Sequence, residues 1–517
     1  MSRNKLHIIF FICFSTLSGF TQAQINHLLL NRENYFRYEA DQVILNKNYD
    51  NQIKPFFSQD TSLPGVINKE NAFYNKTIDK LYFEAEPLIN FQLRKETSDN
   101  KYYSYNNVGG LFGARYKKLS FACKLDYTFN QPDSITKSFV SENYTLPHYR
   151  KINSLNNYSA FNFNFRLNWN VYKSLDLEIG NANNFIGEGY YSMFLSDNAP
   201  AYPYFKINTN FRRIKYQFIL SKLVHTENTI TNNIINYNEY QKYGVFHFFS
   251  IDVFKRFNIG IFEAVIWKDK DSLRQRGIEY RYINPLMFIR PVEYSIGSPD
   301  NILLGLSCNL LLGKNVKLYS QLMLDEFALP HVKARDGWWA NKQALQAGIK
   351  IYNVMGVKYL MMLAEIDFVR PYTFSHLDPV QSYGHFNQSL AHPYQSNFAE
   401  GLFIVDFNNK KFRINNKNIF LIKGENPIIV TPTGNILETN EGSNMFLPYT
   451  SRNKEFDNYV GQGVKTTMLQ NSITFGYYLF HKNYLVELGL TNYLYKTGED
   501  KIRDKLYFNL GIRSYLY

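Results

Sequence analysis

One stretch decides the fold of this chain: Phe161-Asn162-Phe163-Asn164-Phe165-Arg166-Leu167-Asn168-Trp169-Asn170-Val171. Apolar and polar side chains alternate along it, so a β-strand with this sequence has one apolar face and one polar face. The length suits a tilted strand that crosses a bilayer, whereas strands of soluble sandwiches are about half as long. The stretch therefore predicts a membrane-spanning strand.

The same alternation recurs along the chain, at 119–128, 316–325, 345–351, 486–490 and 506–512. Aromatic residues make up 17% of the sequence, yet the mean hydropathy is −0.34. An unpaired strand edge is costly in lipid, so strands of this kind have to close. The pattern predicts an all-β fold, a transmembrane antiparallel β-barrel of about 14 to 18 strands. A large secreted β-sandwich or propeller is the alternative.

The first residues have the features of a secretory signal peptide. Arg3 and Lys5 precede an apolar core at 8–14, and Thr21-Gln22-Ala23 offers a small-residue cleavage site. Cys13 lies inside that core without the small residues of a lipobox, so cleavage is favoured over lipidation. We expect residues 1–23 to be a signal peptide, 24–77 an N-terminal periplasmic or plug segment, and 78–517 the barrel.

Charge and cysteine content narrow the possible partners. The formal net charge is +13, which favours anionic partners such as lipopolysaccharide, acidic glycans or phosphates. The basic residues form no single cluster in the sequence, so we expect a distributed, solvated charge, and no nucleic acid as partner of an exported chain. Cys123 and Cys308 both fall on apolar strand faces, so we expect free thiols rather than a disulfide.

A series of short polar and aromatic blocks fills the middle of the chain. They are 184–192 (NFIGEGYYS), 195–200 (LSDNAP), 202–203 (YP), 282–285 (YINP), 290–293 (RPVE), 297–301 (GSPDN), 324–327 (LDEF), 337–342 (GWWANK), 370–376 (RPYTFSH), 383–387 (YGHFN) and 390–393 (LAHP).

In this order the blocks resemble the Wzi-like capsule-assembly family of outer-membrane barrels. They are most similar to its Bacteroidetes branch, which includes the gliding-motility protein RemB. The resemblance covers roughly residues 180–400. It implies a cell-surface barrel that retains capsular polysaccharide or serves gliding motility. The family has no agreed catalytic residues, so the resemblance assigns no catalytic role to this chain.

The polar blocks hold too many charges to face lipid, where a Lys or Arg costs about 2 to 4 kcal/mol at mid-bilayer. We expect them in the lumen or on loops. They would form either an ion-paired network that holds the barrel's shape or a polar path in which Trp stacks on sugars and Arg or Asn bonds their polar groups. The candidate contacts are Glu188, Asp197, Asn198, Arg290, Glu293, Asp325, Trp338, Trp339, Arg370, His376, His385 and His392.

Motifs for catalysis or metal binding are weak. The spacing of His376, His385 and His392 matches no helical or tight-turn ligand pattern, so we expect loop histidines rather than a metal site. Glu188 and Asp197 could be a carboxylate pair for glycoside hydrolysis, but a lumen ion pair is the simpler interpretation. The sequence contains no phosphate-binding loop, nucleophile elbow or zinc-protease motif. We expect neither an enzyme nor a cofactor.

The sequence thus favours an exported outer-membrane protein that binds or organises surface polysaccharide and supports capsule assembly or gliding. A diffusion channel is the first alternative, and an enzyme acting on glycans is the second. The expected partners are outer-membrane lipids and lipopolysaccharide, surface or capsular polysaccharide, and the gliding machinery. The aromatic end of the chain at Tyr517 resembles the signal that the barrel-assembly machinery recognises.

Overall fold

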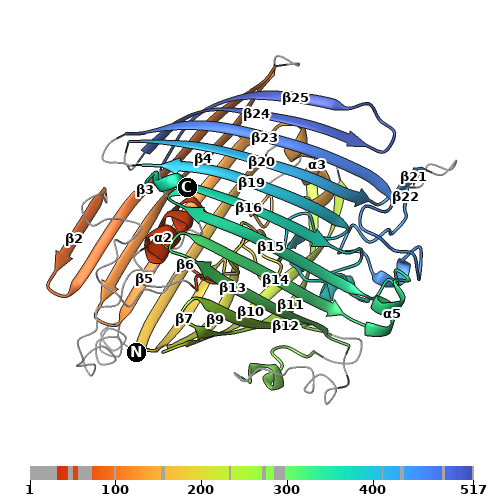
Figure 1. The fold of residues 1–517 in the computed structure, drawn as a ribbon, viewed down its shortest axis with the longest axis horizontal. Coiled ribbons are helices and arrows are strands. Elements are labelled where there is room, and N and C mark those ends of the chain that lie inside the picture. Colours follow the sequence, from red (N-terminus) through yellow and green to blue (C-terminus); the bar gives the residue numbers. More distant parts are fainter. Residues whose placement is uncertain are drawn as a thin grey trace.

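The computed structural model describes residues 32–44, 50–55, 73–97, 101–152, 158–231, 234–270, 275–284, 297, 299–409, 411–430, 436–479 and 484–514. Within these residues, 18 antiparallel strands form a closed barrel (Figure 1). The ring closes where the last strand pairs with the first long one, with Leu510 opposite Leu93. The predicted fold class is confirmed, at the upper end of the expected range of strands.

The strands of the ring follow one another in chain order. They are β3 (Leu81–Glu96), β4 (Tyr102–Tyr116), β5 (Leu119–Gln131), β6 (Tyr158–Tyr172), β7 (Leu175–Ala182), β9 (Tyr202–Phe211), β10 (Ile214–Thr231), β11 (Ile234–Phe254), β12 (Phe257–Lys268), β13 (Asn301–Leu312), β14 (Val316–Glu326), β15 (Lys342–Tyr352), β16 (Leu360–Val369), β19 (Phe398–Asn408), β20 (Phe412–Glu425), β23 (Val464–Leu479), β24 (Tyr484–Thr497) and β25 (Arg503–Ser514). β2 (Tyr74–Ile78) pairs with the start of β3.

The remaining elements lie in the plug region and in the loops. They are α2 (Arg32–Ile44), β1 (Ile53–Lys54), α3 (Ser134–Asn143), β8 (Phe185–Ile186), η1 (Tyr280–Ile283), α5 (Leu329–Ala334), η2 (Val354–Gly356), η3 (Pro379–Gln381), β17 (Gly384–His385), β18 (Gln388–Ser389), β21 (Ile428–Val430), β22 (Ile436–Glu438) and η4 (Tyr449–Ser451). None of the helices among the described residues is long and apolar enough to cross a membrane.

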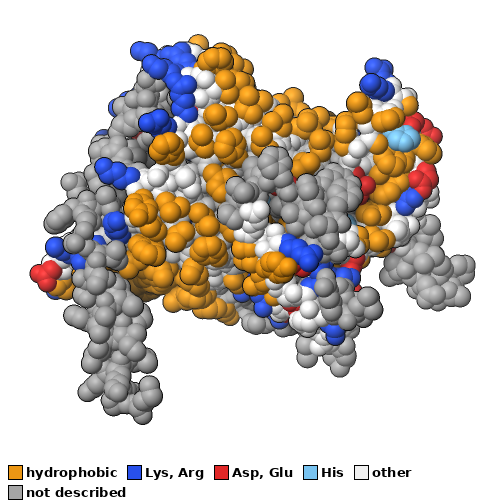
Figure 2. Space-filling model, turned by 90° about the horizontal axis from the view of Figure 1, so that it is seen from below, with side chains coloured by type: hydrophobic (Ala, Val, Ile, Leu, Met, Phe, Trp, Pro, Cys, Tyr) orange, Lys and Arg blue, Asp and Glu red, His pale blue; other side chains and the backbone are white. Residues whose placement is uncertain are grey.

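The alternation in β6 sorts its side chains as the sequence predicts. Phe161 and Phe163 are 65% and 42% exposed on the outer face, whereas Arg166 on the inner face is 1% exposed. Figure 2 shows the result for a whole side of the barrel, a broad band of hydrophobic side chains over the strands. Such a band is what a lipid-facing surface requires. Cys123 and Cys308 stand in β5 and β13 beside outward leucines and are free, as expected.

The two ends of the barrel differ in their connections. At one end, which we call the short-turn end, neighbouring strands are joined by tight turns such as 117–118, 212–213 and 255–256. At the other, the long-loop end, long segments such as 327–341 and 426–463 connect them. In outer-membrane barrels the short turns are periplasmic and the long loops extracellular. By that rule the long-loop end faces outward from the cell.

Segments of the chain itself fill much of the lumen. The loops 183–201 and 370–397 meet inside, where the Tyr383 hydroxyl donates a hydrogen bond of 2.6 Å to the Phe194 carbonyl. Phe194 in turn stacks on Phe262 of the inner wall, with 4.9 Å between ring centroids, and both are fully buried. The wall opposite is less covered, because the inward Gln470, Ser472 and Thr474 of β23 stay partly exposed.

The N-terminal segment also reaches into the barrel. Glu39 of α2 is fully buried against Lys350 of β15, and β1 pairs with β8, Ile53 opposite Ile186. These contacts lie toward the short-turn end, because Lys350 is near the last residue of β15. The division at residue 77 stays a prediction, although residues 74–78 already pair with the barrel wall.

Candidate functional site

A cluster of aromatic rings lies at the long-loop end, and we call it the aromatic platform: His331, Trp338, Trp339, Tyr449 and Phe456. The imidazole of His331 stacks on Trp338, with 4.4 Å between ring centroids and 27° between planes. Trp338 and Trp339 meet edge to face at 6.1 Å, and Trp339 lies 4.8 Å from Tyr449. Two loops that are far apart in sequence, 327–341 and 426–463, therefore build one aromatic surface.

Backbone hydrogen bonds fix the two loops to each other. The Trp339 amide donates to the Glu455 carbonyl at 2.9 Å, and the Asn458 amide donates to the Gly337 carbonyl at 2.9 Å. Gly337 has a φ of +66°, and a Cβ there would lie 2.6 Å from the Asn458 nitrogen. Only glycine meets both demands without strain. The backbone of the two loops therefore holds the rings of the platform in place before any ligand binds.

Side-chain contacts complete this arrangement. The Asp336 carboxylate accepts hydrogen bonds from the Trp338 amide at 3.0 Å and from the His331 ring nitrogen Nδ1 at 2.6 Å. Arg370, at the end of β16, donates from Nη2 to the Trp338 carbonyl at 3.2 Å. The guanidinium of Arg452 lies 4.3 Å above the Trp339 ring and also pairs with Glu455.

The platform presents both apolar ring surface and charged donors to solvent. Phe456 is 47% exposed, the neighbouring Tyr459 is 62% exposed, and the two tryptophans are half-buried. Aromatic rings of this kind pack against the C–H faces of sugars, while a guanidinium donates to hydroxyl or carboxylate oxygens. The arrangement can bind an extended polar polymer such as a glycan.

Beneath the platform, a buried ion pair between Lys342 and Asp325 holds the beginning of the loop 370–397. The Lys342 ammonium lies 2.9 Å from Asp325 Oδ1 and also donates to the Ser375 carbonyl at 3.0 Å. His376 lies near Tyr449, at 6.0 Å between ring centroids. Burial, and then the positive charge of Lys342, lower the pKa of His376 to about 4. The ring is therefore neutral near pH 7 and supports packing rather than charge.

A second charged cluster holds the N-terminal segment in place, and we call it the plug cluster: Glu39, Lys54, Glu188, Lys317 and Lys350. Lys350 lies 2.6 Å from Glu39 and 3.7 Å from Glu188, and Lys317 lies 2.6 Å from Glu188. Burial would raise the pKa of Glu39, but the charges of Lys350 and Lys54 outweigh it and lower this pKa to about 2. All five side chains are nearly inaccessible to solvent.

The third group of predicted residues joins the two lumen loops. Asn198 donates to the Ser389 carbonyl at 3.1 Å, and the Asp197 carbonyl lies 3.3 Å from Nδ1 of His148. His385 accepts a hydrogen bond of 3.0 Å from the Val224 amide, and burial lowers its pKa well below the usual value. These residues connect loops to each other and to β10. Arg290 and Glu293 lie outside the described residues.

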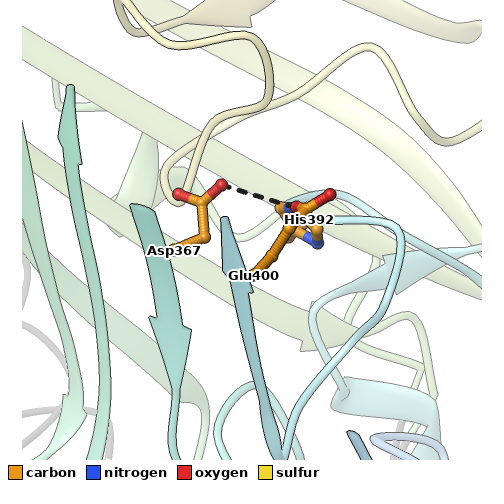
Figure 3. A group of neighbouring side chains, drawn as sticks. All are labelled: Asp367, His392 and Glu400. Atoms are coloured by element: carbon orange, nitrogen blue, oxygen red, sulfur yellow. Dashed lines mark hydrogen bonds and ion pairs between the residues drawn. The ribbon is translucent and has the colours of Figure 1, made fainter. Parts of the chain in front are cut away.

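The last predicted histidine belongs to an acidic cluster. His392 Nε2 lies 2.7 Å from Glu400 Oε2 and 3.7 Å from Asp367 Oδ2, and all three residues are buried (Figure 3). In the part of the chain that is described, this is the group with a spacing that could hold a metal ion. However, Nδ1 accepts a hydrogen bond from the Tyr394 amide, so the proton of a neutral ring sits on Nε2 and is donated to Glu400. His392 and Glu400 therefore have the geometry of a hydrogen-bonded pair.

Ten of the twelve sequence-predicted residues lie in the described part of the chain, and they fall into separate places. The structure brings Trp338, Trp339 and Arg370 together, with His376 next to them. Glu188 belongs to the plug cluster, beside Lys317 and Lys350, whereas Asp197 lies in the lumen loop near His148. His331, Tyr449, Arg452 and Phe456 were missed, and the histidine next to the Gly-Trp-Trp block was the one signal that could have indicated one of them.

Comparisons with known proteins give structural likenesses only. No family model and no curated protein matches the sequence. Wzi of Escherichia coli, described as an outer-membrane protein involved in group 1 capsule assembly and a carbohydrate-binding β-barrel, is similar in structure with a TM-score of 0.49 and 10% identity, over 83% of this chain and 84% of that one. Acinetobacter baumannii OccAB4 gives a TM-score of 0.42 and 8% identity over 84% and 98%, and Pseudomonas aeruginosa OprD gives 0.41 and 8% over 86% and 96%. Identity this low transfers no residue role to the present chain.

Proposed function

We propose that this chain is an outer-membrane surface protein that binds surface polysaccharide at the aromatic platform. The observation that carries the proposal is the position of the platform, since two loops hold it rigidly at the end that faces outward in barrels of this type. Export through cleavage after Ala23 and insertion by the barrel-assembly machinery belong to the same proposal. The sequence blocks that resemble the Wzi-like family favour a role in capsule attachment or, as in the RemB branch, in gliding.

We propose binding without catalysis. Glu188, one of the two carboxylates that the sequence offers for glycoside hydrolysis, is 1% exposed and lies 2.6 Å from Lys317. It accepts a further hydrogen bond from the Asn51 amide at 2.8 Å. A carboxylate that is buried and bonded in this way cannot reach a glycan at the surface. Asp336, beside the platform, is already engaged by His331 and by the Trp338 amide.

Diffusion through the lumen is the second candidate function, and one observation favours it. The inward side chains Gln470, Ser472 and Thr474 of β23 remain partly exposed, so solvent reaches this wall. The opposite wall is covered, because the inward Phe246 and Met323 are fully buried under the lumen loops. The covered wall favours surface binding over an open channel.

The proposal is tested by measuring how purified full-length protein in detergent binds the polysaccharide of its own cells. The double variant Trp339→Ala, Arg452→Gln removes the ring and the cation above it, and we expect the dissociation constant to rise at least about tenfold, or about 1.4 kcal/mol. The matched control is Phe211→Ala, Arg212→Gln, because this pair also places a guanidinium over an aromatic ring, 5.3 Å from its centroid, but at the short-turn end.

The control variant should bind as the wild type does. Equal affinity of the platform variant and the wild type would refute binding at this surface. Deleting the gene and scoring capsule retention beside colony spreading then separates the capsule role from the gliding role.

A further inference from the structure

Among the described residues, the turns at one end of the barrel carry basic side chains with almost no acids beside them. Every described turn at the short-turn end carries Lys or Arg, and we call these residues the basic girdle; the turns are 79–80, 117–118, 173–174, 212–213, 255–256, 313–315, 353–359 and the pair 409 and 411. Asp79 is the one acidic residue among them. In Figure 2 the Lys and Arg side chains accordingly gather toward the left, at the short-turn end. A distributed charge is what the sequence predicts, because a pair of strands separates each turn from the next along the chain.

Five basic side chains of the girdle are exposed to solvent and can meet an external ligand. Lys173, Arg212, Arg213, Lys255 and Arg256 are all exposed. No ion pair joins any of these five to an acidic side chain among the residues that the structure describes. At the long-loop end, in contrast, acids accompany the bases, as in the pairs of Arg503 with Asp500 and of Arg452 with Glu455.

An aromatic ring stands beside several of the girdle residues. Lys117 lies 5.1 Å from the ring centroid of Tyr116, Arg212 lies 5.3 Å from Phe211, and Lys358 lies 4.9 Å from Tyr359. Phe211 is also 54% exposed. Aromatic residues at this height mark the boundary between hydrocarbon and headgroups in membrane barrels. The basic groups therefore sit at the depth of lipid phosphates.

We infer that the basic girdle is a binding site for the phosphate groups of anionic phospholipids in the leaflet at the short-turn end. Lys and Arg donate charge-assisted hydrogen bonds to phosphate oxygens, and Arg does so with two nitrogens at once. The girdle recurs on turns from β2 to β20 rather than on one sector of the rim. A soluble anionic macromolecule would contact one sector, whereas lipid surrounds the barrel.

The barrel carries its own reporter for this site. Trp169 lies on the outer face of β6, 38% exposed, opposite Leu119 and thus next to the turn 117–118. Lys118 reaches the same place, since its ammonium donates to the Val171 carbonyl at 3.0 Å. Trp267 is fully buried, and Trp338 and Trp339 lie at the long-loop end. Bromine on lipid acyl chains quenches tryptophan on contact, so it reports the lipid beside Trp169.

The experiment reconstitutes the full chain in phosphatidylcholine vesicles with brominated phosphatidylcholine or brominated phosphatidylglycerol. We expect brominated phosphatidylglycerol to quench Trp169 with an apparent affinity about fivefold higher at low salt, which corresponds to the roughly 1 kcal/mol gained by one basic residue near an anionic surface. Salt should reduce the preference, because exposed charges are screened. Trp169→Phe identifies the part of the signal that comes from this residue.

Two variants with the same loss of charge locate the site. The triple variant Lys117→Gln, Lys118→Gln, Lys173→Gln should bring the ratio of the apparent affinities for phosphatidylglycerol and phosphatidylcholine close to one. The control Lys454→Gln, Lys496→Gln, Lys501→Gln, at the long-loop end, should keep the preference. Equal quenching of the wild type by the two lipids, or a preference that salt and the first variant leave unchanged, would overturn the inference. Because the wild-type and salt arms need no variant, they decide the question even if a variant fails to fold.

Discussion

Replacing Glu188 with Gln is expected to lower the free energy of unfolding by about 3 to 5 kcal/mol. Glu188 is one of two anions in the plug cluster, which also holds the three lysines Lys54, Lys317 and Lys350. The substitution leaves Lys317, which is 1% exposed, without the carboxylate at 2.6 Å. A buried charge without a counter-charge is costly, because the low-dielectric interior does not replace its hydration.

Urea unfolding of the barrel in vesicles measures this change. The control is Asp500→Asn, whose exposed pair with Arg503 has a length of 2.9 Å and should contribute no more than about 0.5 kcal/mol. Adding Lys317→Met to Glu188→Gln should restore part of the loss, since the orphaned ammonium is then removed. A Glu188→Gln variant as stable as the control variant would show that the cluster does not hold the plug.

The second large effect concerns the lipid face of β6. Phe165 points outward in the middle of this strand and stacks on Phe163, with 5.5 Å between ring centroids. Phe165→Lys places an ammonium near the bilayer centre, which should cost about 2 to 4 kcal/mol and impair insertion. Its neighbour Asn164 is 7% exposed on the inner face, and its side-chain oxygen accepts no hydrogen bond from any described residue. Asn164→Leu should therefore insert like the wild type.

Heat-modified gel migration after folding into vesicles gives the inserted fraction for both variants. The two positions are adjacent, so the comparison isolates the face of the strand from its place in the chain. Equal tolerance of both substitutions would mean that the assignment of inner and outer faces is wrong.

The local sequence predicts a strand wherever lipid lies on one side and water or polar groups on the other. β6 and β14 meet this condition, since Lys317 and Gln321 of β14 are buried inside while Leu318 and Leu322 face outward. Prediction fails where the lumen is filled. In β12 the inward Phe262 is fully buried beneath a loop, so large apolar side chains occur on both faces of this strand and the alternation is lost. The number of strands therefore could not be fixed from the pattern.

The candidate site could be predicted only in part. Trp338, Trp339 and Arg370 carry side chains suited to glycan binding, and the structure places them together. Tyr449 and Arg452 come from a loop about a hundred residues later and have no local signal. Contacts between distant loops depend on how the barrel closes. The alternation of apolar and polar residues along each strand does not encode this closure. The basic girdle was missed for the same reason.

The conductance of purified full-length protein in planar bilayers tests most directly whether this is a filled barrel that works at the cell surface. With the lumen loops and the plug cluster in place, we expect no large, steady single-channel steps above the background of the bilayer. Large and steady currents from the wild-type chain would mean that the lumen is an open path, and they would contradict the proposal of surface binding.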